Sequence, residues 1–461
     1  MELALALTSG LLFWSGFAPL EFWVGPYLGA ALLYRALSRS GLRYRFAIAA
    51  LAGLAFFAPL LHWSGSFVGS VPWLALTVLQ TGLFALVALA PRNPFGFAIT
   101  FTLIELLRMK APFGGFGWGR IGFTQVEILN HLYPIIGVTG ISLLVLLLGA
   151  LLNQMQLTSA TALSIFILAP MLLSTAPATG AIEVVAVQGG VDKLGLDFSN
   201  RPLSVFNRHI AATSELDITP DLVIWPENSA DIDPLSNPVA KRSIQATLAD
   251  LATPILVGAV QRDQFGPQNV AILFNPDGSI ASRYQKQDLA PFGEYMPLRA
   301  LAEAIVPQAR QVNDFQPGDI WVIHQVAGAA FTSPICFEVL DDDLIKSAAR
   351  GVDFIATQTN NATFGTSPQA TQQLQIIRAR AAEVGREFAV VSTTGHTAKV
   401  EIDGSISARL PQFATGALEM QVGLRSEVTM ATRLNSWHWW LIGVIALFAR
   451  PVGSRLIAYR R

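Results

Sequence analysis

Long apolar runs, separated by short polar or Gly- and Pro-containing breaks, occupy the first 175 residues of this 461-residue chain. A helix needs about 20 mostly apolar residues to cross a bilayer. Seven runs meet that requirement, at about 2–18, 20–37, 45–62, 72–90, 94–109, 132–152 and 159–175, and an eighth lies at about 437–453. Only 14% of the residues are charged, against roughly 25% in soluble proteins. We therefore predict a membrane protein with about eight spanning helices.

The Lys and Arg residues of the short loops predict the orientation, because cytoplasmic loops carry an excess of positive charge. With eight spans, one side of the membrane carries Arg35, Arg39, Arg43, Arg45, Arg92, Arg450, Arg455, Arg460 and Arg461. The other side carries only Arg108, Lys110 and Arg120. We expect both termini in the cytoplasm and the segment between the seventh and eighth spans on the extracytoplasmic side.

The segment 180–436 is of ordinary polarity and alternates strand-like with helix-like text, which is typical of an α/β domain. Expected strands are 182–189, 221–227, 254–261, 269–275, 328–338, 353–360, 387–394 and 398–406. Expected helices are 199–217, 239–252, 341–350 and 367–385. The organisation is thus a membrane domain at 1–176, a catalytic domain at 180–436, and a last helix with a basic tail at 437–461.

The loop 110–127, "KAPFGGFGWGRIGFTQVE", combines glycines with aromatic residues. Two interpretations remain open. It is either an interfacial aromatic belt with turns, or a substrate-facing or re-entrant segment on the same side as the catalytic domain.

Three strand ends carry residues that suit acyl transfer. Glu227 ends "VIWPE", Lys286 follows "SRYQ", and Cys336 ends "SPIC" as the only cysteine of the chain. Open α/β sheets bind ligands beyond the carboxyl ends of their strands. A thiol could act there as nucleophile, a carboxylate as general base and an ammonium as oxyanion stabiliser.

Each of these features also has a simpler explanation. A lone cysteine is more often a small buried residue, "WPE" alone could be a strand-ending turn, and Lys286 alone an ordinary surface lysine. "PFGEY" (291–295) could be a glycine turn. For Asp341 to Asp343 we predict a solvated first helical turn, where carboxylates suit the helix dipole.

Taken in order, W-P-E, K-x-x-L-x-P-F-G-E-Y-x-P and I-C-F-E resemble the nitrilase superfamily. With seven apolar runs before the domain and one after it, the whole chain resembles the apolipoprotein N-acyltransferases, membrane-embedded members of that superfamily. Further matches are "VQGG", "FGWGRIGFTQ", "QQLQIIRARAAEVGRE" and "PQF" (411–413).

The resemblance implies an αββα sandwich on the outer face of the bacterial inner membrane. It implies a ping-pong reaction, without cofactor or metal, in which a phospholipid acyl chain passes through a Cys thioester to the amine of an S-diacylglyceryl-cysteine apolipoprotein. The residues that match the family's functional positions are Glu227, Lys286 and Cys336 as the triad, with Glu294, Glu338, Asn269, Arg380 and Phe337 supporting them. Phospholipid, apolipoprotein and membrane lipids are the implied partners, and we expect a monomer.

Two positions depart from the family pattern. Asn228 and Ser229 follow "WPE" where many relatives have Thr-Ala. Many relatives also have a Trp near the start of the domain, where the nearest counterpart here is Leu196.

Some classes are disfavoured. A net charge of −1 gives no nucleic-acid footprint, and six scattered His residues give no metal-ligand spacing. Three alternatives to acyl transfer remain: a membrane-tethered amidase with the same triad and water as acceptor, a transporter with an outer binding domain, and an inactive scaffold. Transporters usually carry polar or charged groups in the middle of their spans, and the predicted spans here have almost none. An inactive scaffold would not need the complete set of Glu227, Lys286 and Cys336.

Overall fold

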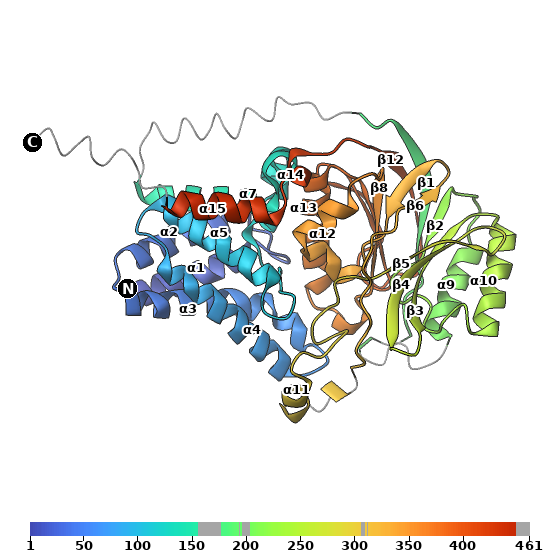
Figure 1. Ribbon diagram of the computed structural model, residues 1–461, viewed down its shortest axis with the longest axis horizontal. Coiled ribbons are helices and arrows are strands. Elements are labelled where there is room, and N and C mark those ends of the chain that lie inside the picture. Colours follow the sequence, from blue (N-terminus) through green and yellow to red (C-terminus); the bar gives the residue numbers. More distant parts are fainter. Residues whose placement is uncertain (155–176, 193, 196–202, 306–308, 311, 449–461) are drawn as a thin grey trace, which may run out of the picture.

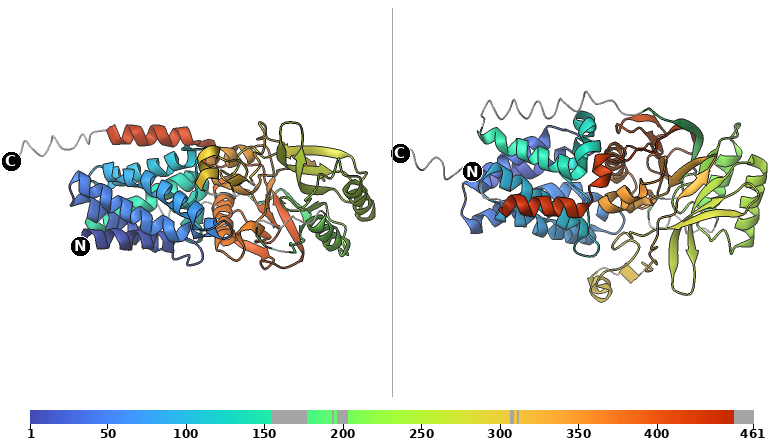
Figure 2. Two further views of the ribbon diagram at one scale, coloured as in Figure 1. Left: turned by 90° about the horizontal axis from the view of Figure 1, so that it is seen from below. Right: turned by 45° about the horizontal axis from the view of Figure 1, so that its top comes forward.

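The computed structural model describes residues 1–154, 177–192, 194–195, 203–305, 309–310 and 312–448. The N-terminal helices form one part of the molecule and a β-sandwich flanked by helices forms the other (Figure 1). Helices α12 (Asp342–Ala348) and α13 (Gln369–Val384) face the N-terminal part, whereas α9 (Ser204–Ser214) and α10 (Pro238–Leu251) cover the opposite end (Figures 1 and 2).

The N-terminal part is helical where the apolar runs predict it. The helices are α1 (Glu2–Ser15), α2 (Gly25–Ser38), α3 (Leu42–Leu60), α4 (Ser70–Phe84), α5 (Pro94–Lys110), α6 (Val126–Leu129) and α7 (Tyr133–Leu151). A 3-10 turn (Ala85–Leu89) extends α4. Among the described residues, three segments are long and apolar enough to cross a membrane: Leu42–Leu60, Ser70–Leu89 and Val126–Leu151.

The prediction of a membrane protein is thus supported, and the count of eight spans is not reached by these helices. The C-terminal helix α15 (Ser436–Phe448) is apolar but shorter than a bilayer requires. It lies beside α5 (Figure 1). The predicted seventh span at 159–175, most of the basic tail, and Leu196 lie outside the described residues.

Local sequence explains where key helices begin. Asn93 and Asn237 stand before α5 and before α10 (Pro238–Leu251), and the side chain of each accepts a hydrogen bond from a first-turn amide. Each is followed by a proline, whose fixed φ suits the first helical position. Helix α13 (Gln369–Val384) ends at Gly385, where φ is 63°, a left-handed conformation that glycine adopts readily.

Two six-stranded sheets form the sandwich. The first has the order β12-β1-β2-β3-β4-β5 and the second β11-β10-β9-β8-β7-β6. The strands of the first are β1 (Gly180–Gln188), β2 (Leu222–Ile224), β3 (Ile255–Arg262), β4 (Pro267–Phe274), β5 (Ile280–Gln285) and β12 (Gly416–Leu424). Those of the second are β6 (His324–Val326), β7 (Ala329–Thr332), β8 (Phe354–Thr359), β9 (Phe388–Ser392), β10 (Ala398–Val400) and β11 (Ile406–Arg409).

The layers follow the αββα order that was expected. Helices α9 (Ser204–Ser214) and α10 pack on the first sheet, and a second core lies between the sheets. Helices α12 (Asp342–Ala348) and α13 cover the second sheet. All eight expected strand regions contain strands, although 398–406 is split into β10 and the start of β11, and 328–338 is strand only over four residues. Strands β6 and β12 were not predicted, and β5 was expected only as the strand end before Lys286.

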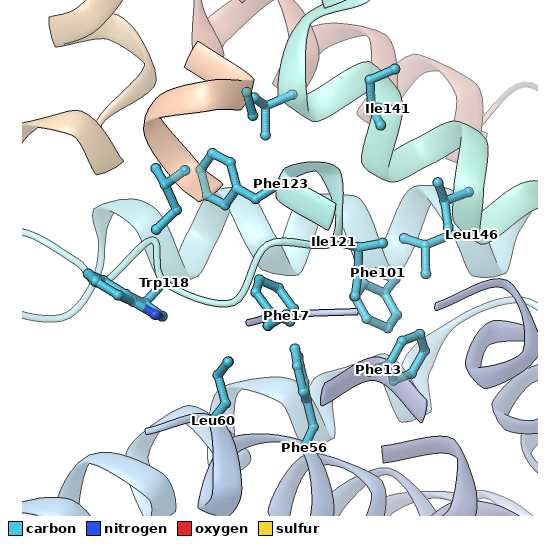
Figure 3. Packing of buried hydrophobic residues seen from close by; sticks show 14 of the residues in the cluster. Phe13, Phe17, Phe56, Leu60, Phe101, Trp118, Ile121, Phe123, Ile141 and Leu146 are labelled. Atoms are coloured by element: carbon cyan, nitrogen blue, oxygen red, sulfur yellow. The ribbon is translucent and has the colours of Figure 1, made fainter. Parts of the chain in front are cut away.

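The two parts of the molecule share one hydrophobic core. Buried side chains from α1, α3 and α5 meet those of the 118–123 loop and α7 in a single cluster, which continues into α13 (Figure 3). Phe123 illustrates the junction: the guanidinium carbons of Arg120 and Arg380 lie 5.5 and 5.2 Å from its ring centroid. Since packed apolar contacts cross the boundary, the helical part holds the sandwich in a fixed orientation.

Candidate active site

Glu227, Lys286 and Cys336 line one cavity at the edge of the sandwich. Glu227 lies three residues beyond β2, and Lys286 directly follows β5. Strand β2 runs parallel to β3, and β4 runs antiparallel to both β3 and β5. Strand β5 therefore ends at the same edge as β2. Cys336 comes from the second sheet, four residues after β7. The predicted convergence of the three residues at strand ends is therefore what the fold produces.

The Glu227 carboxylate and the Lys286 ammonium are buried in a shared hydrogen-bond network. Lys286 Nζ lies 3.3 Å from Glu227 Oε1 and 2.8 Å from Glu294 Oε2. Asn269 Nδ2 donates to Glu227 at 2.7 Å and to Glu294 at 2.8 Å. The main chain fixes this arrangement, because Lys286 N donates to Asn269 O at 2.9 Å. Two carboxylates thus hold the ammonium, and one amide holds both carboxylates.

Cys336 begins a 3-10 turn, Cys336–Leu340, in a left-handed conformation with φ 50°. Asn228, next to Glu227, is also left-handed, with φ 54°. Such conformations cost non-glycine residues about 1–3 kcal/mol and gather at active sites. The thiol is half-buried and accepts a hydrogen bond from Gln373 Nε2 at 3.5 Å. The strained turn therefore presents Sγ to the cavity.

Glu338 connects the Cys336 turn to the strand that precedes Lys286. Its Oε2 accepts from Ile335 N at 2.6 Å, just before the cysteine. Its Oε1 accepts from Tyr284 Oη at 2.7 Å and from Gln287 N at 2.7 Å, on either side of Lys286. One buried carboxylate thus fixes the distance between the ends of β5 and β7.

Arg380 does not contact Glu227, Lys286 or Cys336. It holds the end of the Cys336–Leu340 turn instead. Its guanidinium donates to the carbonyls of Val339 and Leu340, both at 2.8 Å. It also lies 2.7 Å from Asp342 Oδ1. The prediction of a solvated acidic turn is wrong for Asp342, which is fully buried between Arg120 and Arg380. Asp341 caps α12 by accepting from two amides.

Burial dominates the electrostatics of the site. It raises the pKa of the Cys336 thiol to about 12, with the Glu227 carboxylate adding to the rise and Lys286 opposing it. Burial likewise raises the pKa of Glu227, again opposed by Lys286. Burial alone would lower the pKa of Lys286, but Glu294 and Glu227 outweigh it and hold that pKa well above its usual value. At neutral pH the thiol is protonated and the lysine charged.

The cavity measures about 1230 Å³, more than the roughly 300–1,000 Å³ typical of small-ligand pockets. Besides the triad and Glu294, its lining includes Phe337 and Asn228. Apolar side chains of α4, of the 110–127 loop and of α11 (Arg299–Ile305) form much of the remainder. Phe113, Phe116 and Trp118 come from that loop, which favours the substrate-facing interpretation over a simple interfacial belt.

Sequence reasoning missed two residues that contact the site. Gln373 donates to the thiol, and Tyr284 donates to Glu338. A signal for Gln373 exists in the sequence, since four glutamines crowd one predicted helix: Gln369, Gln372, Gln373 and Gln375. The structure buries all four, and buried amides are normally hydrogen-bonded. Nothing in the sequence marks Tyr284.

No group of three or more His, Cys, Asp or Glu side chains in the described parts of the chain is arranged to hold a metal ion. The expectation that the reaction needs neither metal nor cofactor is not tested by this.

Known families match both parts of the chain. Residues 9–151 match the apolipoprotein N-acyltransferase N-terminal domain, and residues 204–430 match the carbon-nitrogen hydrolase family. An amidase from Nesterenkonia sp. is a similar solved structure, with a TM-score of 0.43 and 16% identity over 59% of this chain and 99% of that one.

Curated relatives extend the match over almost the whole chain. An apolipoprotein N-acyltransferase of Photobacterium profundum is 26% identical, over 95% of this chain and 92% of that protein. The apolipoprotein N-acyltransferase of Mycolicibacterium smegmatis is 34% identical, over 94% of this chain and 81% of that protein. With that identity over most of both proteins, and with both halves matched in the same order, this chain belongs to the apolipoprotein N-acyltransferase family.

Proposed function

We propose that this protein transfers an acyl chain from a membrane phospholipid to the N-terminal amine of an S-diacylglyceryl-cysteine apolipoprotein, through a thioester on Cys336. The observation that carries the proposal is the composition of the cavity. A nucleophile, a buried carboxylate and an ammonium share it with apolar side chains of α4. A lipid can therefore reach the thiol without leaving an apolar environment.

In the first half-reaction, the Cys336 sulfur attacks the ester carbonyl of the phospholipid while Glu227 takes the thiol proton. The C–S bond forms, the C–O bond to glycerol breaks, and the proton passes from Glu227 to the departing lysophospholipid oxygen. The Lys286 ammonium, with the main-chain amide after Cys336, stabilises the negative charge on the carbonyl oxygen. One such donor is worth about 3–4 kcal/mol of barrier.

In the second half-reaction, the neutral amine of the apolipoprotein attacks the thioester. Glu227 accepts a proton from the attacking nitrogen, the C–N bond forms and the C–S bond breaks. The proton returns to the sulfur, so that the enzyme regains its starting state. An α-amine titrates near 7.7–8, so the neutral form is available near physiological pH.

The supporting residues position this machinery. Asn269 and Glu294 hold Glu227 and Lys286 in place. Glu338 and Arg380 hold the two ends of the Cys336 turn through main-chain groups. Phe337 lines the cavity next to the sulfur, where an apolar ring suits an acyl chain.

Anchoring the site at the bilayer has an energetic reason. Extracting an acyl chain into water costs about 0.8 kcal/mol per methylene, so a soluble enzyme would bind such a donor poorly. We further propose eight spans with both termini in the cytoplasm and residues 180–436 outside, supported by the distribution of Lys and Arg. Single cysteines introduced in a Cys336→Ser background at Gly41 and Asp403, both exposed, test this with a membrane-impermeant thiol reagent on intact cells: only the cysteine at 403 should react.

The test of the reaction is intact-mass analysis of the purified protein after incubation with phospholipid vesicles. The wild type should gain one acyl mass, and Cys336→Ser should gain none. Glu227→Gln should fold normally and also remain unmodified. The absence of an adduct on the wild type would remove the proposal.

The same experiment separates acyl transfer from the amidase alternative. The thioester of an acyltransferase should persist in water and disappear when a diacylglyceryl-cysteine peptide is added, with the acyl chain recovered on the peptide amine. Rapid loss of the adduct to water, as free fatty acid, would identify water as the acceptor.

A further inference from the structure

Helix α4 carries a one-sided wall of the cavity that runs from its first turn towards the protein interior. The lining residues are Val71, Pro72, Ala75, Leu76, Leu79 and Gln80. Their spacing places them on a single face of the helix. Nine residues of helical rise make this wall about 14 Å long.

The two ends of the wall differ in exposure. Val71 at its outer end is 43% exposed, whereas Gln80 at its inner end is 1% exposed. The five residues that precede Gln80 in this wall are all apolar. The wall is therefore an apolar groove that is open at one end and ends at a buried amide.

A fixed polar pair forms that inner end. Gln80 Oε1 accepts a hydrogen bond from Arg108 Nε at 2.5 Å. Arg108 also donates to the Trp118 carbonyl at 2.6 Å, and its guanidinium lies 4.4 Å from the ring centroid of Phe57. An acyl chain offers no acceptor for Arg108 Nε, so displacing Gln80 would leave that buried donor without its hydrogen bond.

An aromatic row leads from the nucleophile towards this inner end. The ring of Phe337, next to Cys336, lies 6.1 Å from that of Phe116, which lies 6.3 Å from that of Trp118. The Trp118 carbonyl is the group that Arg108 holds. The path from the sulfur along these rings therefore finishes at the same residues as the wall of α4.

The opposite apolar wall is less suited to an acyl chain. Leu298, just before helix α11, and Leu301 and Ile305 within it line the cavity, but they are 62%, 56% and 56% exposed. The helix protrudes from the body of the molecule (Figures 1 and 2). A chain lying there would remain exposed along its whole length, whereas the inner end of the groove along α4 is buried at Gln80.

From this geometry we infer that the thioester-bound acyl chain lies along α4 and that the Gln80–Arg108 pair limits its length. Gln80 is thus a residue that determines which acyl chains the enzyme accepts. The inference rests on the proposed thioester on Cys336 and adds to it the position and the length limit of the acyl group.

The experiment offers the full-length protein vesicles of phosphatidylethanolamine in which dilauroyl, dipalmitoyl and distearoyl lipids are mixed equally. Intact mass at short times gives the chain-length profile of the adduct. Gln80→Ala removes most of the end wall and should enrich longer chains, by about four-fold per additional methylene buried. Leu76→Trp narrows the groove nearer its mouth and should enrich the lauroyl adduct.

Two further variants make the result specific. Val78→Ala lies on the same helix, is 66% exposed and does not line the cavity, so its profile should match the wild type. Leu301→Trp narrows the α11 wall instead. A shift with Leu301→Trp but not with Leu76→Trp would overturn the inference, as would normal adduct formation with an unchanged profile in both Gln80→Ala and Leu76→Trp.

Gln80→Ala could fail to fold because Arg108 Nε loses its acceptor. In that case the chain-length profile of Leu76→Trp alone tests the inference. A wild type that forms no adduct would instead defeat the proposed function, which is a different outcome from an unchanged profile.

Discussion

Arg120 and Asp342 form a fully buried ion pair between the loop that follows α5 and the helix that follows the nucleophile turn. Asp342 has a second partner in Arg380, at 2.7 Å, and Arg380 holds the carbonyls of Val339 and Leu340. One carboxylate therefore connects the membrane part of the chain to the turn that carries Cys336. The position of the sulfur relative to the lipid-facing helices depends on this connection.

Asp342→Asn should strongly destabilise the protein, because it removes the carboxylate paired with the buried Arg120 and leaves Arg380 with Glu383 alone. Breaking a buried pair in this way costs about 3–5 kcal/mol. The measurement is thermal unfolding in detergent. Lys110→Ala is the matched control, since Lys110 pairs with Asp341 at 2.7 Å but is 41% exposed, and an exposed pair contributes at most about 1 kcal/mol. Equal losses in the two variants would contradict the buried connection.

Two variants should move the acidic limb of the pH–rate profile for thioester formation in opposite directions. Burial raises the pKa of Glu227; Lys286 lowers it and Glu294 raises it. The base works only when ionised. Lys286→Met therefore raises this pKa and moves the limb to higher pH, and Glu294→Gln lowers the pKa and moves the limb to lower pH.

Lys286→Met should also reduce the rate on the plateau by roughly 10²–10³-fold, as the loss of an oxyanion donor does. Single-turnover acylation followed by mass gives both quantities. Shifts of the same sign in the two variants would show that Glu227 is not the titrating base.

Glu338→Ala should slow thioester formation by about 10²-fold, because a misplacement of about 1 Å at the reacting atoms has that effect. The variant releases Ile335 N and Gln287 N together, so the ends of β5 and β7 are no longer tied. Tyr284→Phe removes only one neutral donor to the same carboxylate. It should raise the barrier to thioester formation by about 1 kcal/mol or less. If the two variants react at the same rate, Glu338 does not position the turn.

Gly137→Ala should destabilise the protein by about 1–3 kcal/mol. Gly137 interrupts α7 with φ 65° and ψ 179°, and a Cβ there would stand 2.5 Å from Glu383 Oε1. That carboxylate accepts from Val138 N at 3.0 Å. Gly82→Ala in α4, where a Cβ would meet nothing within 4 Å, should instead stabilise by about 0.5–1 kcal/mol. Comparison of the two unfolding midpoints tests whether α7 must break at Gly137.

The sequence alone determined the family of the protein and which side chains were predicted to form its site. Apolar runs predict membrane helices because a bilayer demands length and apolarity from each segment independently. The order of Glu227, Lys286 and Cys336 at strand ends predicts one site because strand ends in an α/β fold meet at an edge. The helix starts at Asn93 and Asn237 are equally local, since a cap depends on a few consecutive residues.

Only the tertiary structure decided which polar residues are buried, because burial depends on partners distant in the sequence. The sequence around Asp342 predicts a solvated helix start. In the structure, Arg120, which lies 222 residues earlier in the chain, pairs with this carboxylate inside the protein. Strands β5, β6 and β12 are weak in the sequence because they gain their stability from pairing with neighbours in the sheet. The groove along α4 likewise cannot be predicted from a run of apolar residues. Which face of the helix lines the cavity depends on tertiary contacts such as that of Gln80 with Arg108.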